Sequence, residues 1–281
     1  MALSFLRLLA IASILAGAVA NPMATGDDPT PALQARANTQ LNPTTAAVVP
    51  LEMALTNGQR LARGLTPNKP HFRRQADRTG RPRTRPSAVA VASAPGQAHC
   101  GPRSGVVHVT GTGLDGFLAA SANRFGEYGY TTTRADALTV SINDCNGSPF
   151  DLVSTNGFRA YPYIGGVQGF ASNGPDLRPG SANYAYIAGT TETAPHATPQ
   201  QVGNSFSAAT GNAEAAESAI WSFHDSTSST LRAQWINTDG STPATVIAYI
   251  PSEGVFVFVG DLQAFEGQFG NVEQATFAFD S

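Results

Sequence analysis

From residue 99 onward, short apolar stretches alternate with clusters of Gly, Asn, Asp and Pro. The stretches are rich in β-branched and aromatic residues and have turn-forming residues at both ends, which predicts strands. They recur about every ten residues, a spacing typical of an antiparallel sandwich or barrel. The predicted strands are residues 105–110, 117–121, 128–132, 138–142, 150–154, 182–188, 219–223, 231–236, 245–250, 255–259 and 275–279.

The sequence also predicts one or two short helices. Asn212 can cap a helix over residues 212–218, and Asp261 can cap one over residues 261–268. The segment 117–121 could open a helix instead of forming a strand, and residues 189–211 resemble a loop because of their prolines. We therefore predict that residues 99–281 form an all-β, two-layer β-sandwich-like domain with one or two short helices.

The first 20 residues have the pattern of a secretory signal peptide. Arg7 precedes an apolar stretch over residues 8–16, and Ala18-Val-Ala20 has small residues where a signal peptidase cuts. The alternative, an uncleaved anchor, requires a longer apolar stretch than this one. We predict cleavage after Ala20, export from the cell, and no membrane partner once the signal is removed.

Residues 21–98 and 99–281 differ sharply in charge. The first segment has 10 Lys and Arg against four acidic residues, whereas the second has six Arg and 16 acidic residues. The first is also rich in Pro, Thr and Gln and poor in aromatic residues, which predicts a disordered basic tail with a short helix over 51–65. Arg73-Arg74 is a candidate dibasic processing site, which would make residues 21–74 a pro-segment. A basic tract on an exported acidic protein is more often a linker or a contact with anionic polysaccharide, so we expect no nucleic-acid partner.

Export decides how the two cysteines are interpreted. Disulfides persist outside the cell, so Cys100 and Cys145 are predicted to pair. The alternative, a catalytic thiol, requires an activating histidine, and His99 is adjacent only in sequence. Asn146-Gly-Ser is a candidate N-glycosylation site, which indicates an exposed loop.

The recognised catalytic and cofactor motifs are weak or absent in the sequence. Gly111-Thr-Gly-Leu-Asp-Gly116 matches a dinucleotide fingerprint, but the chain lacks the alternating strands and helices that give this motif its function. A glycine-rich turn is the better interpretation. The histidines lack the spacing that places two ligands on one strand or helix face, so we predict neither a metal site nor a cofactor.

Acidic residues near strand ends could supply a glycosidase pair, which requires two carboxyl groups on opposite sides of a cleft. The candidates are Glu127, Asp136, Glu217 and Asp261. The sequence does not choose among them, and a solvated acidic surface is the simpler interpretation. Catalytic residues are therefore left unassigned.

Aromatic residues beside amides and carboxylates are the most distinctive feature of the domain. Two tyrosine pairs have the i, i+2 spacing that places both rings on one face of a strand, and a hairpin could bring the two tryptophans together. Such rings stack on the apolar faces of sugars while polar groups bind the hydroxyls. The alternative is core packing. The candidate ligand residues are Tyr161, Tyr163, Tyr184, Tyr186, Trp221, Trp235, Asn237 and Asp239.

Several segments resemble those of uncharacterised secreted proteins from mushroom-forming (basidiomycete) fungi. They are Leu55-Thr-Asn-Gly-Gln-Arg-Leu-Ala-Arg-Gly-Leu-Thr-Pro67, Phe125-Gly-Glu-Tyr-Gly, Pro149-Phe-Asp-Leu, Tyr161-Pro-Tyr-Ile-Gly-Gly, Asn183-Tyr-Ala-Tyr-Ile-Ala-Gly-Thr, Ala219-Ile-Trp-Ser and Gln234-Trp-Ile-Asn-Thr-Asp-Gly. The resemblance implies export and a fungal source. It assigns no activity to any residue.

The sequence thus leads to three hypotheses. The first is a secreted, non-enzymatic domain that binds extracellular or cell-wall polysaccharide through aromatic residues. The second is a secreted hydrolase that acts on polysaccharide with an Asp/Glu pair, and the third is a structural or adhesive surface protein. Converging carboxyl groups in a pocket favour the hydrolase, whereas an open site without them favours the binding domain.

Overall fold

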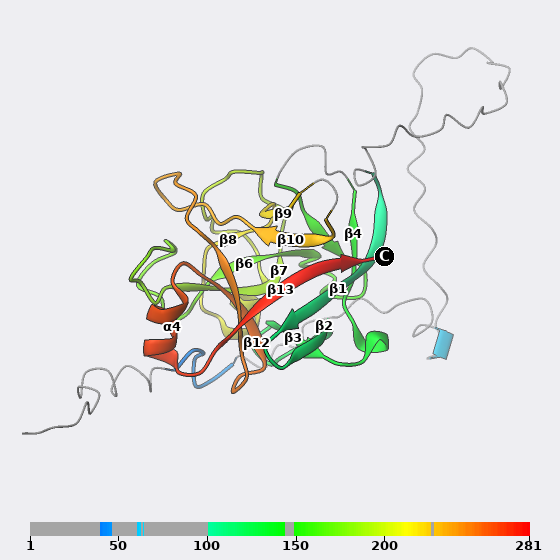
Figure 1. Ribbon diagram of the computed structural model, residues 1–281, viewed down its shortest axis with the longest axis horizontal. Helices are drawn as coiled ribbons and strands as arrows, with labels where there is room; N and C mark the ends of the chain where they lie inside the picture. The colour runs from blue at the N-terminus through cyan, green and yellow to red at the C-terminus, as the bar shows by residue number, and fades with distance from the viewer. Residues whose placement is uncertain (1–39, 47–60, 63, 65–100, 144–148, 226–227) are drawn as a thin grey trace, which may run out of the picture.

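The strands of the protein are antiparallel and belong to one continuous sheet (Figure 1). The computed structural model describes residues 40–46, 61–62, 64, 101–143, 149–225 and 228–281. Its strands are β1 (Arg103–Gly111), β2 (Leu114–Ala122), β3 (Tyr128–Thr131), β4 (Thr139–Ile142), β5 (Leu152–Ser154), β6 (Tyr163–Gln168), β7 (Tyr184–Thr190), β8 (Ala216–Glu217), β9 (Trp221–Phe223), β10 (Thr230–Ala233), β11 (Val246–Ile250), β12 (Val255–Val259) and β13 (Glu273–Asp280). The helices are η1 (Arg134–Asp136), α3 (Ser205–Thr210) and α4 (Leu262–Phe269).

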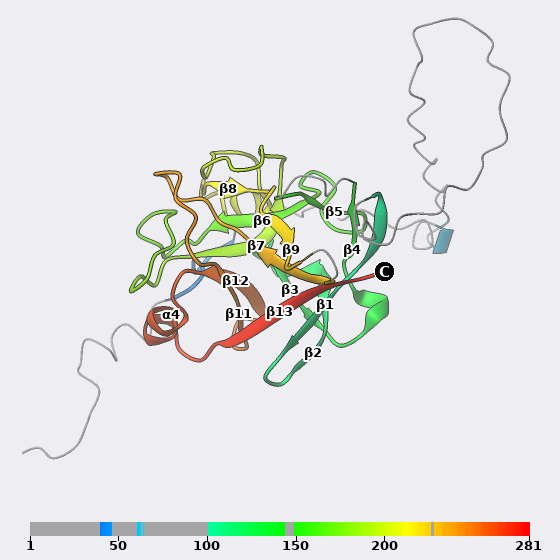
Figure 2. The ribbon, with the colours of Figure 1, turned by 45° about the horizontal axis from the view of Figure 1, so that its top comes forward.

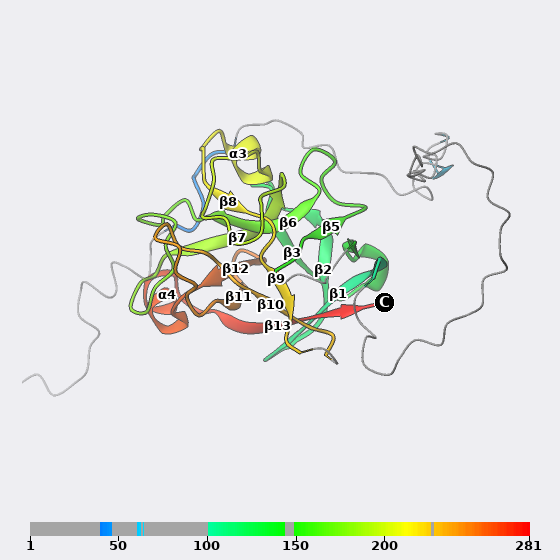
Figure 3. The same ribbon diagram turned by 90° about the horizontal axis from the view of Figure 1, so that it is seen from above.

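The sheet folds back on itself because several of its strands pair with more than two others. Different parts of one edge of such a strand are then hydrogen-bonded to different neighbours. The strand order is β3-β2-β1-β4-β5-β6-β7-β12-β11-β13-β10-β9, with β8 beside β6. Additional pairings join β3 to β12 and β1 to β13. Figures 2 and 3 show β6, β7 and β8 on one side of the domain and β13 on the other. The fold is therefore all-β and sandwich-like, as the sequence predicts.

Two hydrophobic clusters lie on opposite faces of β7 and β12. Phe256 and Phe258 of β12 enter the first cluster, and the intervening valines enter the second. On β7, Ala185 and Ile187 face the first cluster, whereas Tyr184 and Tyr186 face the second. These strands are buried along their whole length, which explains why they are apolar at successive positions rather than at alternate ones.

The helices α3 and α4 and the N-terminal segment 40–46 cover the second cluster. Phe206 of α3, Phe265 of α4 and Leu41 all pack in it. Each helix begins at a side chain that accepts a backbone N–H bond, Asn204 from Ser207 and Asp261 from Ala264. Figure 3 shows the two helices at separate positions on the outside of the strands.

The structure confirms most of the predicted strands and corrects several details. Residues 117–121 lie in β2 and not in a helix, and the glycine-rich motif forms the turn from β1 to β2. The helix capped by Asp261 is confirmed. The prediction of a helix over 212–218 is wrong, because that stretch contains β8. The helix α3 lies earlier in the chain, within residues 189–211, which were predicted to form a loop. Strand β6 was not predicted, since its glycines weaken the strand signal.

The structure also corrects the prediction of disorder for one segment of the tail. Residues 40–46, predicted as disordered, pack against the domain, and Leu41 and Asn42 are buried. Within the predicted helix 51–65, the structure describes Leu61 and Ala62 as helical. Gly64 lies in a turn, and the other residues of that predicted helix and the signal peptide lie outside the described residues.

Close packing at β6 leads to a first prediction. A Cβ built on Gly166 would lie 2.5 Å from the Trp235 ring and 3.2 Å from Phe258. We expect Gly166→Ala to lower the free energy of unfolding by about 2 kcal/mol, because ring and strand must move apart. Urea unfolding measures this loss. Gly174→Ala, where an added Cβ meets nothing within 4 Å, is the matched control and should change stability by less than about 0.5 kcal/mol.

Candidate functional site

Both tryptophans are core residues and not ligand platforms. Trp221 and Trp235 are 0% exposed. Trp221 Nε1–H donates to the carbonyl of Ile164 at 2.6 Å, and Trp235 Nε1–H donates to that of Pro175 at 2.9 Å. With rings packed and indole N–H groups satisfied, neither side chain can stack on a sugar. This corrects the ligand assignment in favour of core packing.

Tyr184 and Tyr186 share one face of β7, as their spacing predicts, but that face is covered. Both rings are buried, at 1% and 0% exposure. Tyr184 packs edge-on against Phe265 and Phe269 of α4, and Tyr186 stacks on Phe206 of α3. Burial raises the pKa of both hydroxyls. Their assignment to an exposed sugar-binding face is therefore wrong.

Asn237 also has a structural role. Its Oδ1 accepts the backbone N–H of Leu177 at 2.9 Å, and its Nδ2 donates to the carbonyl of Leu177 at 3.1 Å. The amide thus joins two loops and is buried, so it is not available to a ligand. Asp239 is exposed and accepts two bonds from Ser241 within its own turn, which lowers its pKa.

Tyr161 and Tyr163 are half-buried, and Tyr163 lies close to the carboxyl groups of Asp151 and Glu192. The Tyr163 hydroxyl donates to Glu192 Oε2 at 3.0 Å, and the hydroxyl of Ser218 donates to Asp151 Oδ1 at 2.7 Å. Burial and the nearby charge of Glu192 raise the pKa of Asp151 to about 6. We call Asp151 and Glu192, together with Tyr163, the carboxylate cluster. It is the part of the predicted aromatic site that solvent can reach.

The four carboxyl groups proposed from strand ends do not converge on one site. Asp136 is exposed in η1, and Asp261 caps α4, where backbone hydrogen bonds lower its pKa. Glu127 and Glu217 are buried, and burial raises their pKa values to about 8 and about 9. Glu217 accepts the Ile236 N–H and Glu127 accepts N–H bonds from Asn42 and Asn123.

An open groove of about 550 Å³ lies beside α4, lined by amide, hydroxyl and small side chains. Asn173 and Ser181 line it from the segment before β7, and Gln263 and Gln268 line it from α4. None of the described lining residues is charged. Carboxamides both donate and accept hydrogen bonds, so this lining suits a neutral ligand with many hydroxyl groups.

The groove is held in shape by its own hydrogen bonds. Asn183 Oδ1 accepts the N–H of Asn173 at 3.0 Å, and its Nδ2 donates to the carbonyl of Asp176 at 3.0 Å. Asp261 Oδ2 accepts the N–H of Gly180 at 2.8 Å. The loop is thereby joined to the start of α4.

Phe170 immediately precedes Ala171, which lines the groove. Its side chain is 40% exposed, and it and Leu61 are the exposed large hydrophobic residues among those described. Sequence reasoning missed Phe170 and the two glutamines. The available signal was a single aromatic residue within the turn-rich segment Gly-Phe-Ala-Ser-Asn-Gly.

Several sequence-based assignments lie outside the described residues. They are the disulfide of Cys100 and Cys145, the glycosylation candidate Asn146, and the processing candidates Ala20, Arg73 and Arg74. Among the residues that are described, no three His, Asp or Glu side chains gather in a way that could hold a metal ion. None of the described helices is long and apolar enough to span a membrane.

The fold and site define an all-β domain with an uncharged open groove and a separate carboxylate cluster. Comparison with protein families, curated proteins and solved structures found no match to this chain.

Proposed function

We propose that the protein is a secreted, non-enzymatic domain that binds neutral extracellular or cell-wall polysaccharide in the groove beside α4. The observation that carries the proposal is the uncharged amide lining of this groove, which includes Ala171, the residue that follows the exposed Phe170. An aromatic ring offers an apolar surface to a sugar face, and amides bind the hydroxyl groups at its edge. The predicted signal peptide and the resemblance to secreted fungal proteins support export.

The aromatic contribution comes from other residues than those predicted. Four of the candidate rings lie in the core, whereas Phe170 is on the surface. The groove volume of about 550 Å³ lies within the range of some 300–1,000 Å³ that is typical of ligand sites, so it is large enough for a short stretch of a sugar polymer. Its open form suits a polymer that enters and leaves the site along its length.

The test is retention of the purified chain on insoluble chitin, β-glucan and cellulose. We expect retention on at least one of them, with affinity reduced about tenfold by Phe170→Ala or by Gln263→Ala. Gln274→Ala, an exposed glutamine on β13, is the matched control and should bind like the wild type. Equal binding by all variants, or absence of retention, would disprove the groove assignment.

The carboxylate cluster favours a second candidate function, polysaccharide hydrolysis. Asp151, with its raised pKa, could donate a proton, and Glu192 would be the second carboxyl group that glycoside hydrolysis requires. Reducing sugar released in the same tubes tests this candidate. Release that is lost in both Asp151→Asn and Glu192→Gln would favour the hydrolase. If neither retention nor release occurs, the structural or adhesive role becomes the better hypothesis.

A further inference from the structure

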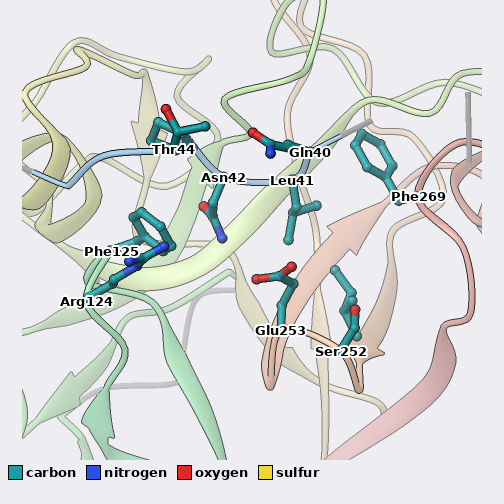
Figure 4. A pocket seen from close by; sticks show the side chains of 11 residues that line it. Gln40, Leu41, Asn42, Thr44, Arg124, Phe125, Ser252, Glu253 and Phe269 are labelled. Carbon is teal, nitrogen blue, oxygen red and sulfur yellow. The ribbon is translucent and has the colours of Figure 1, made fainter. Parts of the chain in front are cut away.

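Residues 40–46 occupy a groove that the rest of the domain forms (Figure 4). Leu41 and Asn42 are 5% and 7% exposed, although the hydrogen-bonding partners of this segment are 85 to 145 residues away along the chain. We call this segment the N-terminal strap. Its buried centre packs between β7, α4 and the turn from β11 to β12.

The groove recognises the main chain of the strap. The hydroxyls of Tyr184 and Tyr186 both donate to the carbonyl oxygen of Leu41, each at 2.6 Å. Each hydroxyl also accepts a backbone N–H, Tyr184 from Ala171 and Tyr186 from Phe170. Because these accepted bonds orient both hydroxyl groups, two hydrogens are aimed at one carbonyl position.

A carboxyl group provides the second contact. Asn42 Nδ2 donates to Glu127 Oε2 at 3.3 Å, and Asn123 Nδ2 donates to the same oxygen at 2.7 Å. Glu127 is completely buried, and its Oε1, like Asn42 Oδ1, has no hydrogen-bond partner among the described residues. The strap therefore covers a buried carboxyl group but satisfies only one of its two oxygens, which leaves this contact weaker than one inside a fully paired core.

The strap does not fill the groove. A cavity of about 280 Å³ remains beside it, bounded by Arg124, Ser252 and Glu253 as well as by the strap itself. Figure 4 shows Glu253 pointing toward Leu41 and Asn42 from the β11–β12 turn. An open flank of this size provides a path along which the strap can leave or be exchanged.

We propose that the Tyr184–Tyr186–Glu127 groove is a peptide-binding site that the N-terminal strap occupies in cis. The bound chemistry is an extended peptide that offers a carbonyl oxygen to the two hydroxyls and a side-chain carboxamide to the glutamate. The strap inhibits this site as long as the chain is continuous. The proposal is independent of polysaccharide binding at the α4 groove.

Chain continuity determines occupancy. A tethered segment acts at a high effective concentration, whereas a cut segment must compete at its actual concentration. A cut between residues 47 and 100 leaves the strap held only by the contacts described here. The candidate dibasic pair Arg73-Arg74 lies in this interval.

The experiment uses the chain without its signal peptide, with a sequence-specific protease site placed within residues 75–98. The probe is a fluorescent peptide of the strap sequence Gln-Leu-Asn-Pro-Thr-Thr-Ala, followed by fluorescence anisotropy. We expect at least tenfold tighter peptide binding after the cut and dilution than before it. The double substitution Tyr184→Phe/Tyr186→Phe in the cut chain should weaken peptide binding at least tenfold. A peptide that carries Asn42→Ala should also bind the cut chain at least tenfold more weakly.

Tyr249→Phe is the control, because that ring packs in the first cluster against Phe256. It should leave peptide binding unchanged. The emission of the two buried tryptophans reports whether the cut domain stays folded. Equal peptide binding before and after the cut would overturn the proposal. A cut chain that unfolds, or that retains its strap against a large excess of peptide, would show that the strap is a structural part of the core and would overturn it too.

Discussion

Replacing Trp221 by alanine is expected to lower the free energy of unfolding by about 4 kcal/mol, the usual cost of deleting a fully buried large aromatic ring. The ring contacts Phe258 and Phe277 with centroid separations of 5.6 and 6.2 Å, so its loss leaves a cavity between the layers. The substitution also leaves the carbonyl of Ile164 without the indole donor. Urea unfolding followed by circular dichroism measures the loss.

Trp221→Phe separates these two contributions. Phenylalanine keeps an aromatic ring against Phe258 and Phe277 but cannot donate to Ile164, so we expect a smaller loss of about 1–2 kcal/mol. Polysaccharide retention should be the same for both variants when they are assayed folded. A loss below 1 kcal/mol for Trp221→Ala, together with weaker retention, would show instead that the ring acts as a ligand platform.

The sequence predicted the strands well because their periodicity has a simple physical cause. Residues 105–110 and 255–259, for example, have β-branched or aromatic side chains bounded by turn residues, and both stretches are strands. The spacing of Tyr184 and Tyr186 also predicted correctly that their rings share a face. Local chain geometry is enough for inferences of this kind.

The burial of the β7 face that carries Tyr184 and Tyr186 was not predictable from the local sequence pattern. Whether two tyrosines meet solvent or the core depends on α3, α4 and the strap, which come from distant parts of the chain. The strap itself lies in a segment whose composition indicates disorder, and its docking depends on three side chains more than 80 residues away. Composition averages over such a segment and cannot show one buried leucine within it.

The groove was missed for a related reason. Gln263 and Gln268 lie on a short helix that was predicted, but their proximity to Asn173 requires the fold of the loop before β7. Exposed glutamines are common on helices, so their type alone indicates no function. The candidate site thus depends on tertiary contacts, whereas the fold class depends on local pattern.

The second large effect is a loss of stability as the pH rises from 5 to 8. Burial raises the pKa of Glu217 to about 9 and that of Glu127 to about 8, so the folded chain holds protons that the unfolded chain releases above its ordinary glutamate pKa of 4.5. Because the folded state then binds more protons, the free energy of unfolding falls with pH, by up to about 1.4 kcal/mol per pH unit for each group. We expect maximal stability near pH 5 and a decrease of several kcal/mol by pH 8, measured by urea unfolding at each pH.

Glutamine substitutions assign this slope to individual groups. Glu217→Gln keeps an acceptor for the Ile236 N–H and remains neutral, so it should flatten the profile between pH 4.5 and 9. Glu127→Gln should flatten it between pH 4.5 and 8, whereas Glu266→Gln, an exposed residue of α4, should leave the slope unchanged. A wild-type profile that is flat or rises between pH 5 and 8 would mean that both buried carboxyl groups are ionised in the folded protein. Water or a cation would then have to reach Glu127 beneath the strap, since a buried charge without a partner is too costly to persist.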